Sequence, residues 1–450
     1  MIEAQASAKS PKPADASGAK PPQPTEFPPA VKKTIGWLST AFAHWYHLHP
    51  VPLPHRYAKR EYGFMQWPER PGPPPFFRHK AFPTAEGLRD YLARAGPHSA
   101  YYSTAYYNRP AELKMADKQW LGAELIFDLD ADHLAEAEAA KAAGHEMPLD
   151  EQLRLVKTQF KRLLDEFLFG DFGLGEDDVW ITFSGGRGYH AHVVEERLLQ
   201  LESRGRREIV DYITGKFPAE RGKETPDLSW LITERVVHPE GRGKFVKKTT
   251  QETMARADAP GWPGRITRTL AATLRERVLE APDRRSAKAW LTSLEGIGAG
   301  GADKFLDRFD ARALERVEAG YVDQGPVVRR VIHNVLAQAT LPFAKGETDE
   351  PVTADTKRLI RLPGSLHGKS GLRVVTLTRS QLDDFEPLRD AVAFGSDPVR
   401  INPRKDAEAT LGGERIAVKA GVETEVPEHH AVFWLARQGG TIVLPDAANR

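Results

Sequence analysis

Two aspartates separated by one residue end an apolar run near position 130. Asp128 and Asp130 follow the segment Leu-Ile-Phe at 125–127, and residues i and i+2 of a strand point to the same face. Their carboxylates would project together, and their mutual repulsion favours a divalent cation beside them. Asp132 is a further acid nearby, which we interpret as a loop residue. The pair predicts a metal site, and a solvated strand end is the alternative.

A glycine-rich segment at 184–192, SGGRGYHAH, is suited to binding an anion. Its three glycines let the backbone approach a ligand closely, and Ser184, Arg187 and His190 supply side-chain donors. Phosphate is the natural ligand, although the segment is not a GxGxxG motif and no P-loop lysine follows it. His190 and His192 share a strand face and could instead ligate a metal. For His192 we favour a packed or hydrogen-bonded histidine.

A second basic and glycine-rich element, KRLIRLPGSLHGKSG, occupies 357–371 and follows DEPVT at 349–353. Pro363 stands where a Walker A loop would have its first glycine, which argues against an NTPase P-loop. Arg361, His367 and Lys369 remain as donors to an anion, and a solvated basic face is the alternative for the lysine. The sequence thus combines carboxylates that could bind metal with two segments that could bind phosphate. Two-metal nucleotidyl transfer requires this combination of residues.

The N-terminal part of the ordered chain is basic and aromatic. Residues 31–82 hold eight Lys and Arg against two acids. Such a segment could hold a nucleic-acid template through phosphate contacts and base stacking, although core packing is the favoured interpretation for most of its aromatic residues. The residues considered are Tyr62, Phe64, Phe76, Phe77, Arg78, Tyr101, Tyr102 and Tyr106.

Local patterns predict the elements that must position these residues, and they alternate between helix and strand. Helices are expected from Val31 to before Pro50 and at 85–95, 149–167, 265–280 and 327–339. Strands are expected at 60–67 and 76–82, which form a hairpin, and at 99–107 and 124–130. A strand, glycine turn and strand are expected at 178–192, and a strand, glycine loop and strand at 356–377.

Length and composition limit the class of protein. The 450 residues contain 63 Lys and Arg against 62 Asp and Glu, yet 124–151 holds nine acids against one lysine, and 355–373 holds five bases against one acid. The near-neutral total therefore hides segregated charge. The absence of cysteine excludes disulfides, thiolate zinc sites, Fe–S clusters and cysteine nucleophiles. With neither a secretory leader nor an apolar run of about 18 residues, we expect a soluble, cytoplasmic protein.

Composition also suggests how the chain is divided. Residues 1–30 contain seven prolines and seven alanines and are expected to form a disordered tail. We expect one core from 31–200 and 340–450, interrupted by a mainly helical insertion at 201–339.

The three motifs resemble those of a known family. FDLD at 127–130, SGGRGYHAH at 184–192 and DEPVTADTKRLIRLPGSLHGKSGL at 349–372 look, in this order, like the signature motifs of the small, catalytic subunit of archaeal and eukaryotic DNA primase. Weaker similarity extends over most of 40–440 and is closest to archaeal members. The resemblance implies an α+β primase catalytic fold, with mixed β-sheets related to an RNA-recognition-like unit, flanking helices and a helical insertion.

The resemblance also implies roles for individual residues. A carboxylate triad that binds two Mg²⁺ or Mn²⁺ ions corresponds to Asp128, Asp130 and Asp349; we choose Asp349 over Asp355 because it lies 18 residues before His367. The residues that correspond to the site of the incoming triphosphate are Ser184, Arg187, His190, Arg361 and His367, with Arg78 as a further basic residue of that site. Relatives usually carry a Cys/His zinc module after the DxD strand, whereas 133–149 is alanine-rich and lacks a thiol, so structural zinc is expected to be absent.

By this resemblance the chain is expected to be a nucleotidyltransferase, the catalytic subunit of DNA primase. It would start short RNA primers from NTPs on a single-stranded DNA template, could also use dNTPs, and would pair with a primase large subunit in an archaeal, nucleoid-associated replisome. One alternative is a primase-polymerase of repair or end joining, and another is a non-catalytic single-strand-binding replisome component. A metal-dependent hydrolase using Asp128, Asp130, His190 and His192 is a more distant alternative. The three acids and the two phosphate-binding segments argue against a non-catalytic binding protein, because binding a single strand does not require a cluster of carboxylates.

Overall fold

The computed structural model describes residues 26–145, 147–215, 231–237, 249–322, 324–339 and 350–444. Its helices are α1 (Pro29–Leu48), α2 (Ala85–Ala95), α3 (Ala135–Ala142), α4 (Leu149–Arg162), α5 (Ser203–Ile213), α6 (Gly261–Leu274), α7 (Arg284–Ser293), α8 (Ala299–Leu306), α9 (Ala311–Glu318), α10 (Pro326–Ala339), α11 (Glu350–Ala354), α12 (Arg379–Asp384), α13 (Pro387–Asp390) and α14 (Glu428–Leu435). Its strands are β1 (Tyr62–Met65), β2 (Phe76–Lys80), β3 (Ser99–Ser103), β4 (Ala105–Tyr107), β5 (Trp120–Ala123), β6 (Leu125–Asp130), β7 (Val179–Phe183), β8 (Gly188–Val193), β9 (Thr233–Val237), β10 (Thr249–Thr253), β11 (Leu359–Arg361), β12 (Val375–Leu377), β13 (Pro398–Pro403), β14 (Ala407–Leu411), β15 (Glu414–Val418), β16 (Thr424–Pro427) and β17 (Gly440–Ile442).

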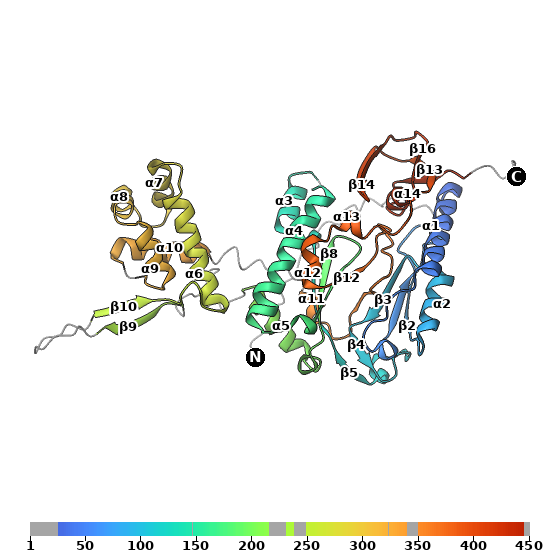
Figure 1. The fold of residues 1–450 in the computed structure, drawn as a ribbon, viewed down its shortest axis with the longest axis horizontal. Coiled ribbons are helices and arrows are strands. Elements are labelled where there is room, and N and C mark those ends of the chain that lie inside the picture. Colours follow the sequence, from blue (N-terminus) through green and yellow to red (C-terminus); the bar gives the residue numbers. More distant parts are fainter. Residues whose placement is uncertain are drawn as a thin grey trace, which may run out of the picture.

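Two four-stranded sheets form the centre of the molecule (Figure 1). One has the strand order β12-β7-β8-β6 and the other β11-β3-β1-β2, so that β6 and β11 are edge strands of their sheets. Every strand pair among the described residues is antiparallel. The expected α+β class is confirmed, and the sheets bring together the strands that carry the acidic and the basic motifs.

Each sheet has its own hydrophobic core. The alternation in β6 places Phe127 and Leu129 against α4, where Phe160 stacks on Tyr189 of β8 with 5.3 Å between ring centroids. The opposite face of β6 contributes Ile126 to the second core, which lies between the β1 sheet, α1 and α2. Because apolar side chains cover both faces of β6, the strand is held rigidly where its last residues meet solvent.

The C-terminal segment returns to the N-terminal helix. The sheet β16-β13-β17 and the helix α14 pack beside α1, and the Ile442 backbone N–H donates to the Thr34 hydroxyl at 3.0 Å. Figure 1 shows α14 above the β3 sheet and next to α1. Because the C-terminal segment packs back against α1, the residues that follow α14 lie at the edge of the central sheets.

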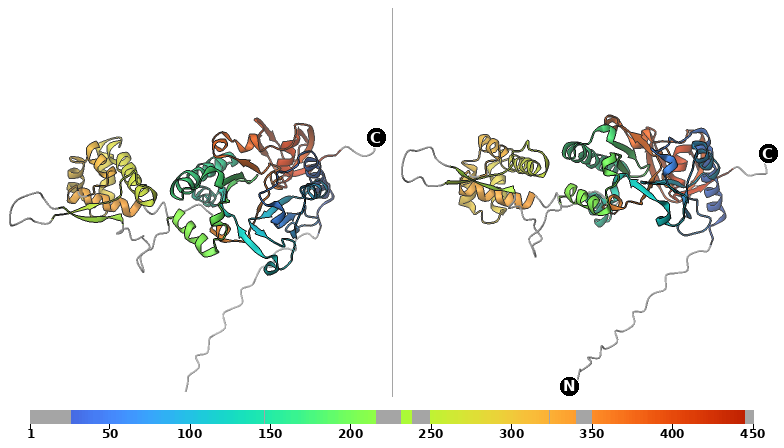
Figure 2. Two further views of the ribbon diagram at one scale, coloured as in Figure 1. Left: turned by 60° about the horizontal axis from the view of Figure 1, so that its bottom comes forward. Right: turned by 90° about the horizontal axis from the view of Figure 1, so that it is seen from below.

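Helices α6–α10 form a helical segment beside the sheets rather than over them (Figure 2). The first turns of α6 anchor it to the centre. The Trp262 indole N–H donates to the Tyr212 carbonyl at 2.6 Å, and the Arg265 guanidinium pairs with Glu166 and Asp171 at 2.7 and 2.6 Å. Arg265 also lies over the ring of Phe167, 4.1 Å from its centroid. A buried cation with two carboxylates and an aromatic face is a specific docking contact.

Most of the elements expected from local pattern are confirmed. The hairpin of β1 and β2, the helix at 85–95 and the strand-turn-strand of β7 and β8 occur as predicted. Helix α1 begins at Pro29, slightly before the expected start at Val31, because proline fits the first turn of a helix. Of the tail predicted at 1–30, residues 1–25 lie outside the described residues, and Pro29 and Ala30 belong to α1. No helix that the structure describes is long and apolar enough to cross a bilayer.

Candidate active site

The two aspartates of the DxD motif lie at the end of β6 and face away from the α4 core. Their strand pairs with β8 so that Asp128 is opposite His190 and Asp130 is opposite Gly188. The side chains keep 21% and 36% of their surface exposed, whereas Leu129 between them is buried. The expected projection of both carboxylates from one face is confirmed.

The glycine turn between β7 and β8 is closed by its own serine. The Ser184 hydroxyl accepts hydrogen bonds from the backbone N–H groups of Gly186 and Gly188, both at 3.2 Å. These two N–H groups are therefore used inside the turn and are not directed at a ligand, in contrast to the expectation from sequence. The hydroxyl proton can still be donated to an anion. Arg187 extends from the turn and pairs with Asp132, and its Nε lies 3.9 Å from Asp130.

The loop after β11 packs directly against this turn. Ser370 donates to the Gly185 carbonyl at 2.6 Å, and its hydroxyl lies 3.1 Å from Nδ1 of His367. Gly185 has φ of +75°, and a Cβ at this position would lie 2.7 Å from Cβ of His367. The two phosphate-binding elements predicted from sequence are thus parts of one wall.

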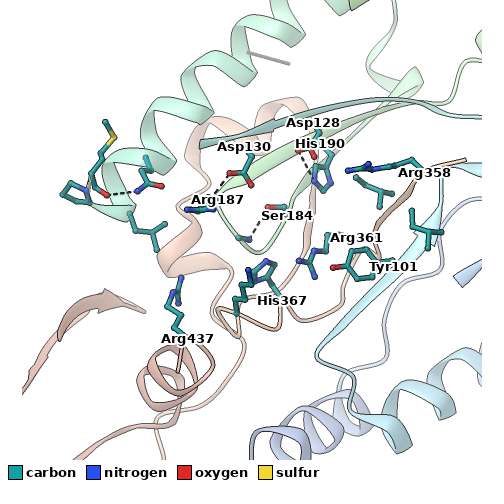
Figure 3. A pocket seen from close by; sticks show the side chains of 18 residues that line it. Tyr101, Asp128, Asp130, Ser184, Arg187, His190, Arg358, Arg361, His367 and Arg437 are labelled. Carbon is teal, nitrogen blue, oxygen red and sulfur yellow. Dashed lines mark hydrogen bonds and ion pairs between the residues drawn. The ribbon is translucent and has the colours of Figure 1, made fainter. Parts of the chain in front are cut away.

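One cavity of about 750 Å³ lies between β6, the glycine turn and β11 (Figure 3). The aspartates project from one side of it, and His367 and Arg437 face them from the loop and the C-terminal segment. It is lined by Tyr101, Asp128, Asp130, Met147, Pro148, Leu149, Gln152, Ser184, Gly186, Arg187, His190, Arg358, Leu359, Ile360, Arg361, His367, Lys369 and Arg437.

Arg361 is the most confined cation of this cavity. Its guanidinium lies over the ring of Tyr101, 4.7 Å from the centroid, and its buried Nη1 has no hydrogen-bond partner in the structure. Arginine keeps its charge even when burial lowers its pKa, as it does here. A buried guanidinium nitrogen that lacks a protein acceptor is expected to bind an anionic ligand.

The two histidines of the cavity are neutral in this environment. Burial, followed by the nearby positive charges, lowers the pKa of both His190 and His367 well below the usual value. Burial likewise lowers the pKa of Arg437 to about 10, with a contribution from Arg187, so Arg437 stays protonated near neutral pH. The cavity therefore offers a fixed positive wall of arginines and neutral imidazoles opposite two carboxylates.

A buried polar chain connects Asp128 to the second sheet. His190 places Nε2 3.5 Å from Asp128 and Nδ1 3.4 Å from the Thr182 hydroxyl, which lies 3.2 Å from Nε2 of His192. Nδ1 of His192 lies 3.4 Å from Glu124. The interpretation of His192 as a hydrogen-bonded core histidine is thereby confirmed.

The last residue of this series of polar contacts is Glu124, which meets a buried arginine just before β1. It pairs with Arg60, and the Tyr106 hydroxyl donates to it at 2.8 Å; the side chains of the ion pair are at most 1% exposed. Burial, the largest influence, would raise the pKa of Glu124, but the charge of Arg60 and the hydrogen bonds with His192 and Arg60 together outweigh it and lower the pKa to about 2. The carboxylate of Glu124 is therefore ionised at all ordinary pH values.

The donor set on β6 fits a hard divalent cation. Carboxylate oxygens that are accessible from a cavity are the ligands that Mg²⁺ and Mn²⁺ prefer. Asp128 and Asp130 supply such oxygens, while Asp349, the third acid predicted for this site, lies outside the described residues. Within the part of the chain that is described, no group of three or more histidines and acids lies close enough to hold a metal ion.

The structure does not bring every predicted residue to the cavity. Arg78 lies on β2, at the far edge of the second sheet, where its Nε pairs with Glu61 at 3.0 Å. Conversely, sequence reasoning did not select Arg437 or Arg358 as site residues. The segment around Arg437 carried only a weak family similarity, and Arg358 was read as part of a basic strand.

Comparisons with known proteins find relatives that match most of this chain. The family model described as DNA primase small subunit matches residues 127–379, which contain both aspartates, the glycine turn and the basic loop. The chain is 39% identical over 411 residues to the DNA primase small subunit PriS of Methanothrix thermoacetophila, covering 90% of this chain and 98% of the relative. PriS of Methanococcoides burtonii is 36% identical over 406 residues and that of Haloarcula marismortui 37% over 412, each covering 90% of this chain and 97% of the relative.

Proposed function

This chain belongs to the DNA primase small subunit family, and we propose that it is the catalytic subunit that joins NTPs into short RNA primers on a single-stranded DNA template. The supporting observation is that a single cavity contains the two aspartates of β6 and, opposite them, the guanidinium of Arg361 with its unpartnered nitrogen. The positive charge of Arg361 is suited to binding a triphosphate, and the two aspartates are suited to holding the metal ions that nucleotidyl transfer requires. Extension with dNTPs and pairing with a primase large subunit are parts of the same proposal.

The proposed mechanism assigns complementary tasks to the two sides of the cavity. Asp128, Asp130 and Asp349 are the residues that would hold two Mg²⁺ or Mn²⁺ ions, and such ions, when bound, would supply activation of the attacking 3′-hydroxyl and charge neutralisation for the leaving pyrophosphate. Arg361 and Arg437 neutralise the triphosphate, since both stay charged in the cavity that they line.

The uncharged donors of the cavity orient the triphosphate. Ser184 and His367 come from two loops that Ser370 joins, so they move as one unit. Preorganised donors of this kind orient the reacting phosphate without reorganisation at the moment of reaction. His190 contacts Asp128 and is proposed to hold that carboxylate as well as to contact the phosphates.

A single incubation tests the proposal. The full chain is mixed with a single-stranded template, labelled NTPs and Mn²⁺, and the products are separated by size. Labelled primers are the expected result. A shortened template would support a hydrolase instead, and a retarded template without new product would support a binding protein. Repeating the reaction with dNTPs and with the cognate large subunit tests the two finer parts of the proposal.

The contact between Gly185 and His367 gives a separate prediction. Gly185→Ala is expected to cost about 1 kcal/mol of unfolding free energy, because alanine disfavours a positive φ. It should also raise the KM for NTP by about 10-fold or more, because the new Cβ displaces His367 from the triphosphate. Urea unfolding and steady-state incorporation measure the two effects.

Gly173→Ala is the matched control for this variant. Gly173 has φ of +64°, but no atom lies within 4 Å of the position of a Cβ there. It should lose the same stability with no change in KM. Equal values of KM for the two variants would contradict the proposed role of the His367 contact.

A further inference from the structure

One face of the β11-β3-β1-β2 sheet continues outward from the cavity. Arg361 is opposite Tyr101, Tyr101 is opposite Gly63, and Met65, two residues along β1, is opposite Phe76. Partners across a sheet and residues two apart share a face, so Arg361, Tyr101, Gly63 and Phe76 lie on one face of the four strands. The first two of these residues line the cavity, and the last reaches the free edge of the sheet.

The rings on this face are in contact. Phe76 meets Tyr101 edge to face, with 5.5 Å between centroids, and Tyr101 lies beneath the guanidinium of Arg361. A Cβ on Gly63 would lie 2.9 Å from Cζ of Phe76 and 2.8 Å from Leu359. Because Gly63 has no side chain, the ring of Phe76 can lie across the sheet. We call Phe76, Tyr101 and Arg361 the aromatic row.

Phe76 and Phe77 of β2 are exposed, unlike the core aromatic residues of this sheet, and Phe76 is the one of the two that shares a face with Tyr101, since Phe77 is opposite Phe64. Tyr62, Phe64 and Tyr102 are at most 1% exposed and belong to the core, whereas Phe76 is 43% exposed. An exposed aromatic ring on an edge strand carries a risk of aggregation and usually marks a binding surface. Sequence pattern could not separate these rings, because all of them occupy similar short strands.

The edge beside the aromatic row is basic. Arg78, two residues after Phe76 and on the same face, is exposed, whereas Lys80 follows a register shift, is opposite Tyr62 and lies on the other face. The Arg78 Nε is 3.0 Å from Glu61, a buried carboxylate that Lys118 also approaches at 3.5 Å. Two cations thus share the one acid, which leaves this edge with a net positive charge suited to phosphates.

We propose that the aromatic row binds the single-stranded template, with a base stacked on Phe76 and the phosphate backbone along Arg78. The proposal rests on the proposed function and adds to it the path by which template reaches the cavity. Exposed rings joined to a basic edge are the usual combination for single-strand binding without sequence preference. Phe76 lies outside the cavity lining that includes Tyr101, so a template base is favoured there over the base of the incoming nucleotide.

Binding of a fluorescent single-stranded oligonucleotide to the full chain tests the proposal without nucleotides and therefore without catalysis. Phe76→Ala is expected to weaken binding by about 10-fold, because one base loses its stacking partner. Phe76→Trp should retain the affinity of the wild-type chain. Arg78→Ala should reduce the slope of log affinity against log salt by about 0.7, the value for one phosphate contact on a single strand.

Phe172→Ala is the matched control, since Phe172 is an aromatic residue of similar exposure, 38%, beyond the π-helical turn that follows α4. Its affinity for the oligonucleotide should be unchanged. Equal losses in Phe76→Ala and Phe172→Ala, or no measurable binding by the wild-type chain at low salt, would overturn the proposal. So would a raised KM for NTP in Phe76→Ala with unchanged template affinity, because Phe76 would then serve the incoming nucleotide.

The two proposals can fail separately. A chain that binds the oligonucleotide through Phe76 but makes no primer, alone or with its large subunit, would refute the proposed function and support this surface. If the wild-type chain makes primers but Phe76→Ala binds the template with unchanged affinity, the proposed function is supported and this surface is refuted.

Discussion

Asp128→Asn is expected to reduce nucleotide incorporation by at least about 1000-fold while the chain stays folded. The substitution keeps the size of the side chain and removes the charge that would hold a divalent cation opposite the triphosphate-binding arginines. His190 and β8 still surround the position, and the two flanking residues of β6 keep their core contacts. Primer synthesis with Mg²⁺ or Mn²⁺ measures the loss, and thermal unfolding checks the fold.

The matched control for this variant is Asp177→Asn, an exposed aspartate just before β7, at the end of that strand away from the glycine turn. Its activity should equal that of the wild-type chain. Incorporation by purified Asp128→Asn at the rate of the control would refute the assignment of the metal site. Asp349→Asn, which replaces the third acid of the proposed triad, is expected to cause a loss of the same size.

Arg60→Met is expected to have the largest effect on stability, about 3 to 5 kcal/mol of unfolding free energy at neutral pH. The variant leaves Glu124 as an uncompensated buried charge and removes donors to the carbonyls of His55 and Ser103, each bonded at 2.7 Å. Urea unfolding measures the change. Adding Glu124→Gln to the variant should recover a large part of the loss, because the glutamine is uncharged and still accepts from Tyr106.

The dependence of stability on pH provides a second check on the ion pair of Arg60 and Glu124. In the wild-type chain the pKa of Glu124 is lowered to about 2, so the stability that its ionised form contributes is complete above its ordinary value of 4.5 and is lost as the pH falls towards 2. In Arg60→Met the charge of Arg60 no longer opposes burial, and the smaller effect of His192 that remains does not offset it, so this pKa rises and acid stabilises the variant relative to the wild-type chain. The difference in stability between the two should therefore shrink from pH 7 to pH 3. If the difference in stability stayed constant between pH 7 and pH 3, the buried charge of Glu124 would not be the cause of the stability lost in Arg60→Met.

Local patterns determined most elements of the site because their signals lie within a few residues. The alternation at 124–130 predicted β6 and the common face of its two aspartates, and three glycines between two β-rich runs predicted the turn before β8. The family resemblance added that these segments belong to one site. The spacing of Arg361 and His367 in the basic loop likewise predicted two donors that the structure places in one cavity.

Other features depended on what covers each residue, which a local pattern does not contain. Tyr101 and Tyr102 are neighbours in the same strand, yet one lines the cavity and the other is core, because the second sheet is covered on one face only. Arg437 reaches the cavity only because the C-terminal segment returns to α1. Sequence alone thus determined which residue types the motifs carry, namely acids at the end of β6 and basic residues in two glycine-rich segments. Tertiary structure decided which aromatic rings stay exposed, which acids are buried with an arginine and which cations face the aspartates, since these depend on packing between segments far apart in the chain.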